Sequence, residues 1–256
     1  MDRYELQETI YSIDCTRTFQ QRKVWKAIDR QNGTEVAVKQ VVVSNFGDYE
    51  KKIYYHEINA LKKLGEIPDP DEFIVRLYDH FLIENGFVIV TRFIPGKSIK
   101  QMVEWLDQEY NDAQQTHLDF RWKLICDLTR AIHFIHNNKF IHSDLNTGNI
   151  ICENESVKII DFEASESFED IGAFYFDISM GFDISQYQDI IDELALPNRQ
   201  FRLARYFSKL PSREEILEKV WGPEKAQVLA RIICTDDSEL KSLSMAEYSS
   251  QILSVV

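Results

Sequence analysis

The sequence predicts an α+β protein of two lobes: a small antiparallel β-sheet with one long helix, then a larger, mainly α-helical part. Short β-branched runs separated by turn residues fill most of the first third of the chain. One helical pattern interrupts these runs, and a second long amphipathic helix follows them. We therefore expect one domain made of two lobes, residues 1–92 and residues 93–256.

Composition limits the compartment and the partners. The chain has 256 residues, of which 44% are hydrophobic, and this is enough to bury a core. Its net charge of −13 argues against nucleic acid or an anionic membrane as the main partner. Its four cysteines show no metal-binding spacing, which indicates thiols in a reducing compartment. The first ten residues show no secretion signal, and no apolar run reaches the roughly 18 residues of a membrane span. We expect a cytoplasmic protein.

The first lobe begins with three strand-like runs. They are Tyr4–Ile10, Lys23–Ile28 and Glu35–Val43, with a turn at residues 30–33 before the third. This pattern predicts an antiparallel meander. A helix is expected over Asp48–Leu64, ended by Gly65, and its stripe of mainly apolar residues includes Glu57. A carboxylate on such a face needs a cationic partner if it is buried, and Lys39 is the candidate.

The middle of the chain contains the transition between the lobes. Strands are expected at Ile74–Tyr78 and Phe87–Phe93, with a turn over residues 84–86 between them. The segment Ile94–Ile99 then breaks to a helix. A further helix over Phe120–Asn137 is predicted by apolar residues along one side: Leu124, Leu128, Ala131 and Ile135.

The stretch from residue 140 to residue 161, FIHSDLNTGNIICENESVKIID, carries the candidate chemistry. Asp144 lies two residues after His142 and five before Asn149. Asp161 follows the β-branched run Val157–Ile160, which should be a buried strand that brings Asp161 to its end. Because Mg²⁺ prefers hard oxygen ligands that it shares with phosphates, an Asn/Asp pair across a hairpin suits it. The ordinary alternative is that these residues cap turns. We interpret the stretch as a phosphoryl-transfer centre.

With these residues the chain resembles the protein kinase family. HSDLNTGN is similar to its catalytic loop, Asp161-Phe162-Glu163 to its metal-binding tripeptide, and Val36-Ala-Val-Lys39 to the strand whose lysine holds the α and β phosphates. The resemblance implies a bilobal protein kinase-like fold. It also implies ATP and Mg²⁺ as cofactors, with Mn²⁺ as an alternative ion.

The same resemblance implies a role for each matching residue. Asp144 accepts or orients the proton of the substrate hydroxyl, and Lys39, held by Glu57, orients the phosphates. The metal ligands are Asn149 and Asp161. Thr91 controls access behind the nucleotide, and the hinge backbone over residues 92–94 pairs with adenine. The other nucleotide-binding positions are Val24, Ala37, Arg92, Ile94 and Ile151.

The glycine-rich loop of the family is absent. Counting back from Val24 puts Arg17, Phe19 and Arg22 where its three glycines would fall. Glycines let backbone N–H groups come close to phosphate, and bulky side chains prevent that approach. Arg17 and Arg22 are either bidentate phosphate donors or solvated charges beside a weakened nucleotide site, and the sequence leaves both interpretations open.

The chain also departs from the family after Asp161. Glu163 replaces a glycine, no alanine-proline-glutamate anchor follows, and the activation segment is very short. The helix Asp183–Leu194 resembles the central helix of the family, which begins with a buried Asp, although Asp177 is an alternative for that Asp. Residues 234–247 resemble its closing helices, with Ser242 at the position of the arginine that pairs with the lost anchor.

The regulation expected from the sequence differs from that of the family's regulated members. Ser143 stands where those members have an arginine that receives a loop phosphate. Activity is therefore expected not to depend on phosphorylation, although Ser165 and Ser167 lie in the segment. Control by a regulatory partner, by localisation or by the loop at residues 17–22 stays open.

Three functions compete. The favoured one is an atypical ATP-dependent Ser/Thr protein kinase acting on a protein hydroxyl. Asn146, where Ser/Thr kinases usually have lysine, and Glu163 favour a small-molecule kinase of the aminoglycoside or choline kinase type. The long helix of Glu57 and the absence of an inserted substrate subdomain favour a protein kinase. The third is a pseudokinase interaction module, for which the glycine-free loop is the main argument.

Overall fold

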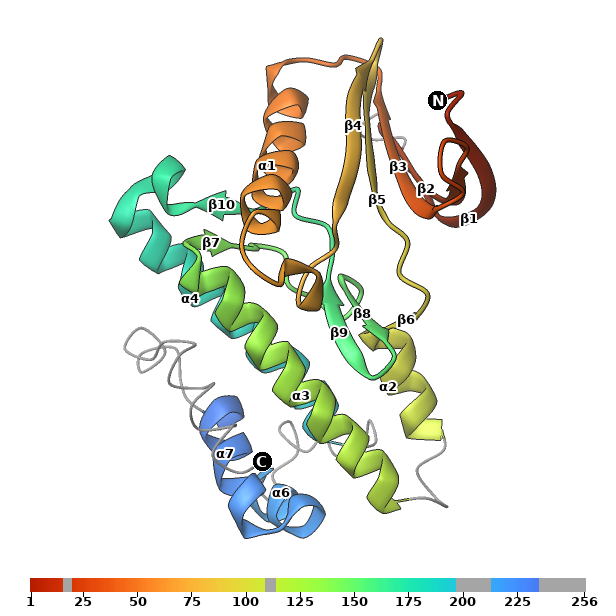
Figure 1. Cartoon of the computed structure of the whole chain (residues 1–256). Helices are drawn as coiled ribbons and strands as arrows, with labels where there is room; N and C mark the ends of the chain where they lie inside the picture. Colours follow the sequence, from red (N-terminus) through yellow and green to blue (C-terminus); the bar gives the residue numbers. More distant parts are fainter. Residues whose placement is uncertain (16–19, 109–113, 197–212, 235–256) are drawn as a thin grey trace. The chain divides into compact units, whose positions relative to one another are not determined.

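The computed structural model describes residues 1–15, 20–108, 114–196 and 213–234 (Figure 1). The strands of the first part of the chain are β1 (Tyr4–Cys15), β2 (Gln20–Asp29), β3 (Glu35–Val43), β4 (Leu77–Ile83) and β5 (Gly86–Arg92). Short strands follow later: β6 (Lys97–Ser98), β7 (Phe140–Ile141), β8 (Ile150–Glu153), β9 (Ser156–Ile159) and β10 (Glu166–Ser167). The helices are α1 (Asp48–Gly65), the 3-10 helix η1 (Pro70–Glu72), α2 (Ile99–Gln108), α3 (Gln114–Asn137), α4 (Phe168–Ala195), α6 (Arg213–Trp221) and α7 (Pro223–Cys234).

The chain divides into two units. The first comprises Met1–Pro95 together with Asp161–Ser165, and the second comprises Gly96–Ile160 together with the chain from Glu166 onwards. The lobe boundary expected between residues 92 and 93 stays a prediction. The α+β class is confirmed, because an antiparallel sheet is followed by a mainly helical region.

The first unit is built on a five-stranded antiparallel sheet in the order β1-β2-β3-β5-β4. The meander and the β4–β5 hairpin expected from the sequence are both present. The hairpin needs glycine at position 86, since a Cβ there would lie 1.9 Å from the carbonyl oxygen of Val41. Strand β4 spans Leu77–Ile83 rather than Ile74–Tyr78, because the chain leaves η1 through Phe73 and regular pairing with β5 starts only at Leu77, opposite Thr91.

Each face of this sheet buries its own cluster of apolar side chains. One cluster consists of Tyr4, Ala27, Val36, Val38, Val88 and Val90. The other, on the opposite face, includes Tyr54 and Ile58 of α1 and consists otherwise of Val41, Val43, Phe87 and Ile89. Helix α1 therefore covers the second face (Figure 1). The alternation of the strands explains the two clusters, because successive side chains point to opposite faces.

Helix α1 carries a buried stripe toward the sheet. Glu57, Leu61 and Leu64 are buried as the spacing predicts, and Ile53 is half-buried. At its start, the carboxylate of Glu50 accepts a hydrogen bond of 3.0 Å from the backbone N–H of Gly47. The helix thus presents the Glu57 carboxylate within a face that is otherwise apolar.

The second unit is built around α3 and α4, which run side by side (Figure 1). The predicted stripe of α3 is buried at all four positions: Leu124, Leu128, Ala131 and Ile135. Helix α7 is joined to α4 by a hydrogen bond of 2.6 Å from Gln188 Nε2 to the carbonyl oxygen of Ile232. Two small sheets, β6-β8-β9 and β7-β10, carry the candidate loop between α3 and β8.

Helix α4 differs from the prediction. It begins at Phe168 rather than at Asp183, with a break at Gly172, whose φ is 72°. Only glycine adopts that backbone conformation without a steric penalty, so the break falls there. Residues 235–247, which include Ser242 and most of the predicted closing helices, lie outside the described residues.

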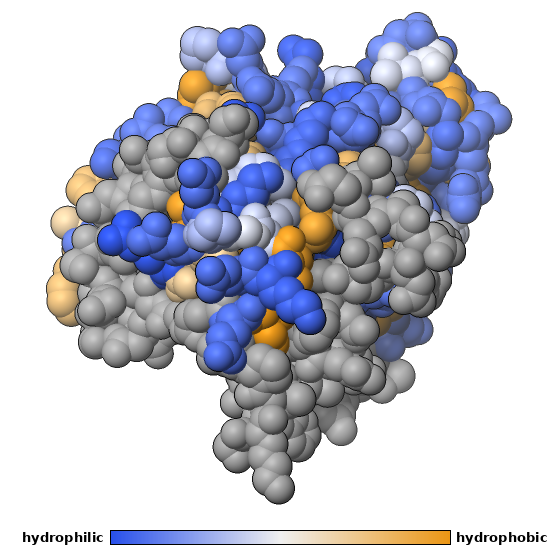
Figure 2. All heavy atoms as spheres, turned by 90° about the horizontal axis from the view of Figure 1, so that it is seen from below, coloured by the Kyte–Doolittle hydropathy of each residue, from blue (hydrophilic) through white to orange (hydrophobic). Residues whose placement is uncertain are grey.

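The described surface is largely polar on the face that Figure 2 shows. Hydrophobic groups are exposed there in separate places. Among the described residues, no helix is both long and apolar enough to cross a membrane.

Candidate active site

The register of the first sheet puts the predicted nucleotide-binding side chains on one face. Val24 lies opposite Lys39, and Ala37 lies opposite Thr91. Opposed residues of an antiparallel pair share a face, and so do residues two apart in one strand. Arg22, two residues before Val24, is therefore on this face too. All five side chains are at least partly exposed there.

The remaining predicted nucleotide-binding residues lie elsewhere. Arg92 pairs with Val36 and so belongs to the opposite face of the sheet. Ile94 is buried after the end of β5. Ile151 is half-buried in β8, in the second unit. Arg17 lies outside the described residues.

Lys39 and Glu57 form the predicted ion pair. Lys39 Nζ donates to Glu57 Oε2 over 2.8 Å, and the two side chains are 15% and 4% exposed. Lys39 is thus the cationic partner that the buried carboxylate of Glu57 requires. This pair joins β3 to α1.

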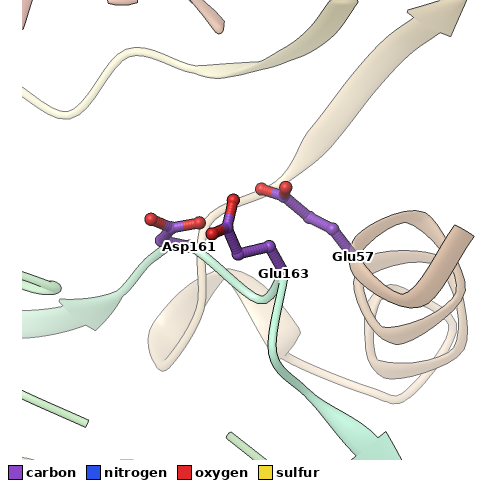
Figure 3. Close-up of side chains that lie close together, drawn as sticks. All are labelled: Glu57, Asp161 and Glu163. Carbon is purple, nitrogen blue, oxygen red and sulfur yellow. The ribbon is translucent and has the colours of Figure 1, made fainter. Parts of the chain in front are cut away.

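Two further carboxylates reach Lys39 from the segment 161–165. Asp161 Oδ1 lies 2.5 Å from Lys39 Nζ, and Glu163 Oε2 lies 3.3 Å from it. Oxygens of Glu57, Asp161 and Glu163 all lie within 4.8 Å of one another. In Figure 3 the carboxylate of Glu163 is drawn between the other two.

Burial and neighbouring charges together shift the pKa values of Lys39 and Glu57. Burial would lower the pKa of Lys39, but the carboxylates of Asp161, Glu57 and Glu163 raise it, so the ammonium group stays charged. Burial, and to a smaller extent the negative charges of Asp161 and Glu163, raise the pKa of Glu57 to about 7 against the opposing effect of Lys39. Glu57 therefore binds a proton more readily than a solvated glutamate would.

Arg22 is not the solvated surface charge that was one of the two interpretations made from the sequence. Its guanidinium Nη1 donates to Glu163 Oε1, and the two side chains are 25% and 18% exposed. The other interpretation, that Arg22 binds phosphate, stays a prediction. The pairing was not predictable, since nothing in the sequence relates two residues that are 141 positions apart.

In the second unit, the loop His142–Asn149 is held by Asp183. The carboxylate of Asp183 accepts from the backbone N–H groups of His142 at 2.8 Å and Ser143 at 2.7 Å, and it lies 3.0 Å from His136 Nε2.

Asp183 is fully buried, whereas Asp177 is exposed. The buried helix Asp is therefore Asp183.

Within this loop Asp144 and Asn149 lie in contact. Asn149 Nδ2 donates to Asp144 Oδ2 and to the Asp144 carbonyl oxygen, both over 2.9 Å. Asp144 is exposed, as a group that acts on a substrate must be. Asn146 Oδ1 accepts from the backbone N–H groups of Gly148 at 2.9 Å and Asn149 at 3.2 Å. Asn146 therefore shapes the loop itself.

His142 connects the loop to the end of the β8–β9 hairpin. Its Nε2 lies 2.9 Å from the carbonyl oxygen of Ile160, and its Nδ1 lies 3.3 Å from the backbone nitrogen of Asp144. An imidazole protonated at Nε2 satisfies both contacts, donating to the carbonyl oxygen and accepting at Nδ1. No local pattern in the sequence indicates this contact, and from the sequence His142 is only a position marker for Asp144.

The residue types at the predicted metal positions suit a divalent cation. Asp161 contributes a carboxylate that is 29% exposed. The amide nitrogen of Asn149 donates to Asp144, so its amide oxygen is the atom that can coordinate a cation. Carboxylate and amide oxygens are ligands that Mg²⁺ accepts. Each of the two residues therefore offers an oxygen of the kind that Mg²⁺ binds.

Comparison with known proteins shows the family. The family model for the protein kinase domain matches residues 20–178, more than half of the chain. The chain therefore belongs to the protein kinase domain family. The match ends within α4, so the extension of the resemblance to nearly the whole chain stays a prediction.

Several kinases are similar to this chain over somewhat more than half of its length. Serine/threonine-protein kinase 10 of Danio rerio is 29% identical over 145 residues, which are 56% of this chain and 13% of that protein. A probable serine/threonine-protein kinase of Dictyostelium discoideum is 32% identical over 149 residues, 57% of this chain and 26% of that protein. Myosin light chain kinase 3 of Rattus norvegicus is 25% identical over 150 residues, 57% of this chain and 17% of that protein. The matched part of the chain spans about a quarter or less of the length of these three relatives.

Proposed function

We propose that this chain transfers the γ-phosphoryl group of ATP, in the presence of Mg²⁺, to a serine or threonine hydroxyl of a protein. The observation that carries the proposal is the ion pair of Lys39 with Glu57, with Asp161 beside the same ammonium group. This arrangement joins a strand, a helix and the segment after β9 at one cation. It is the cation that the family uses to hold the nucleotide phosphates.

Each residue has a distinct role in the proposed reaction. Lys39, fixed by Glu57, orients the α and β phosphates. Asp161, with Asn149 of the second unit, holds Mg²⁺, which when bound supplies positive charge that offsets the charge of the phosphates. Asp144 accepts or orients the proton of the attacking hydroxyl, and its contact with Asn149 fixes its direction.

The adenine ring is expected against the partly exposed face of the sheet. Val24 and Ala37 supply apolar surface there, and Thr91 lies next to Ala37 on the neighbouring strand. Ile151 of the second unit and the backbone of residues 92–94 complete the proposed adenine contacts. A serine or threonine substrate is supported by the names of the similar kinases.

Calorimetric titration with ATP tests this function first. We expect binding that strengthens on addition of Mg²⁺, and we expect Asp161→Asn to remove most of that strengthening. The matched control is Asp189→Asn, an exposed Asp of α4, which should bind as the unchanged protein does. Absence of binding at millimolar ATP, with Mg²⁺ or Mn²⁺, would contradict the proposal and favour an interaction module.

A further inference from the structure

Glu163 and Arg22 are two charged residues where the family has glycines, and they contact each other. The carboxylate of Glu163 bridges two cations of the same sheet face: Oε1 accepts from Arg22, and Oε2 lies 3.3 Å from Lys39. Neither contact is available to glycine. The two departures from the family are therefore connected in space.

The segment 161–165 is attached to the first unit, although its chain neighbours on both sides belong to the second. Polar contacts from three of its residues hold it there. Asp161 contacts Lys39, Glu163 contacts Arg22, and the carbonyl oxygen of Ser165 lies 3.0 Å from His56 Nδ1 of α1. Between them, the side chain of Phe162 is fully buried. Side-chain contacts thus fix the segment on the sheet and on α1.

The backbone of the segment needs such support. Asp161 has a φ of 63°, a left-handed conformation that is costly for residues other than glycine. Such a conformation persists only where the surrounding contacts fix it. A glycine at position 163 would increase the conformational freedom of the backbone near this strained residue, whereas a glutamate held in an ion pair decreases it.

Arg22 also balances the charge of Glu163. Without Arg22, the single ammonium group of Lys39 would face three carboxylates. With it, three carboxylates face two cations. The pair is partly buried, so its attraction is screened less than that of a surface pair. Glu163 can therefore occupy this place without withdrawing Lys39 from Glu57.

We propose that Arg22 and Glu163 form a positioning pair that holds the segment 161–165 on the β2–β3 face, so that Asp161 stays beside Lys39 without any modification of the chain. The two residues act through Asp161 and Lys39. The consequence for Mg²⁺-dependent nucleotide binding rests on the proposed function, but the attachment of the segment does not.

The first experiment measures amide hydrogen exchange of peptides covering residues 161–165 in the nucleotide-free protein. We expect Arg22→Gln and Glu163→Gln each to speed exchange there by about fivefold or more, because local opening becomes easier. The controls are Arg30→Gln and Glu5→Gln, the same substitutions in an exposed ion pair of β1 and its neighbouring turn. Exchange no faster than in these controls overturns the proposal.

Double substitutions separate a pair from two independent residues. If the residues act through each other, Arg22→Gln/Glu163→Gln exchanges no faster than the more affected single variant. The conservative variant Arg22→Lys, which keeps a cation opposite Glu163, should retain much of the protection. Additive effects in the double variant overturn the pairing, and circular dichroism establishes that each variant is folded. If Arg22→Lys does not fold, the single and double glutamine variants decide the result.

The second experiment measures the ratio of ATP affinity with Mg²⁺ to ATP affinity without it. We expect Glu163→Gln to lower this ratio by about tenfold, a loss of roughly 1.4 kcal/mol, because Asp161 is no longer held in place. A merely structural role would lower the melting temperature and leave the ratio unchanged, which overturns the proposed consequence for binding. If the unchanged protein binds no nucleotide but the exchange results hold, the proposed function fails and the positioning pair stands.

Discussion

Lys39 of β3 and four charged side chains around it, from β2, α1 and the segment 161–165, compensate one another's charges. The loop His142–Asn149 of the second unit is held differently, by backbone N–H groups that donate to one buried carboxylate, Asp183. The first arrangement depends on the charge state of each member. The second arrangement depends on one buried carboxylate, whose hydrogen bonds to water are replaced by hydrogen bonds from backbone N–H groups at fixed positions.

This contrast indicates where each centre is vulnerable. Removing one charge from the Lys39 cluster leaves other charges that can redistribute their contacts. Removing Asp183 leaves buried N–H groups with no acceptor, and unsatisfied buried donors are costly. The loop should therefore be the more sensitive of the two to a single substitution, and the cluster the more sensitive to pH.

The largest expected effect on stability is that of Asp183→Ala. It leaves the N–H groups of His142 and Ser143 without their acceptor, and we expect the free energy of unfolding to fall by about 3–5 kcal/mol. Urea denaturation measures the loss, with Asp189→Ala, an exposed Asp of the same helix, as the matched control. A difference of less than about 1 kcal/mol between the two variants would show that Asp183 does not anchor the loop.

A smaller effect is expected from the titration of Glu57. Its folded-state pKa is raised, mainly by burial, from 4.5 to about 7. The folded protein therefore binds a proton that the unfolded chain releases, so the stabilising contribution is complete below pH 4.5 and is lost as the pH rises toward 7. We expect this contribution to be about 1–3 kcal/mol.

Glu57→Gln tests that titration, because glutamine keeps the shape and cannot ionise. Chemical denaturation at a series of pH values from 4.5 to 8 should show the unchanged protein losing stability relative to Glu57→Gln as the pH rises. Glu66→Gln, at the exposed end of α1, is the control and should run parallel to the unchanged protein. A constant difference between the unchanged protein and Glu57→Gln would contradict the raised pKa.

The smallest expected effect concerns Ser165 and Ser167. Both are buried: Ser165 Oγ donates to the carbonyl oxygen of Phe162 over 2.7 Å, and Ser167 Oγ, as the N-cap of α4, accepts from the backbone N–H of Asp170. Only six residues, Phe162–Ser167, separate Asp161 from the start of α4. We expect phosphatase treatment, or the double variant Ser165→Ala/Ser167→Ala, to change the initial rate of transfer by less than about tenfold. A larger loss in either would show that activity depends on modification of this segment.

The elements that local patterns specify could be predicted from the sequence. Strand β3 has the expected bounds, and α1 differs from its expected range by one residue. The stripe of α3 and the buried Glu57 follow from helical spacing, and the Lys39–Glu57 pair follows from the need of a buried carboxylate for a cation. The strand and the helices are determined by residues close in sequence, and the ion pair is determined by the need of a buried carboxylate for a cation.

The contacts that the sequence could not reveal join distant residues. Arg22 and Glu163 looked like two independent losses of glycine, because no local pattern relates them. The choice between Asp177 and Asp183 needed the path of α4, which extends through the break at Gly172. The contact of His56 with the Ser165 carbonyl oxygen likewise depends on how the segment after β9 lies on α1.

The central claim is that the chain transfers a phosphoryl group, and transfer from γ-labelled ATP with Mg²⁺ to generic protein substrates tests it most directly. We expect the unchanged protein to label the substrate, and Asp144→Asn to lower the turnover number by about 10²–10⁴-fold with little change in ATP affinity. Asp189→Asn should label as the unchanged protein does. If the unchanged protein binds ATP but transfers nothing, or if Asp144→Asn turns over normally, the account is contradicted.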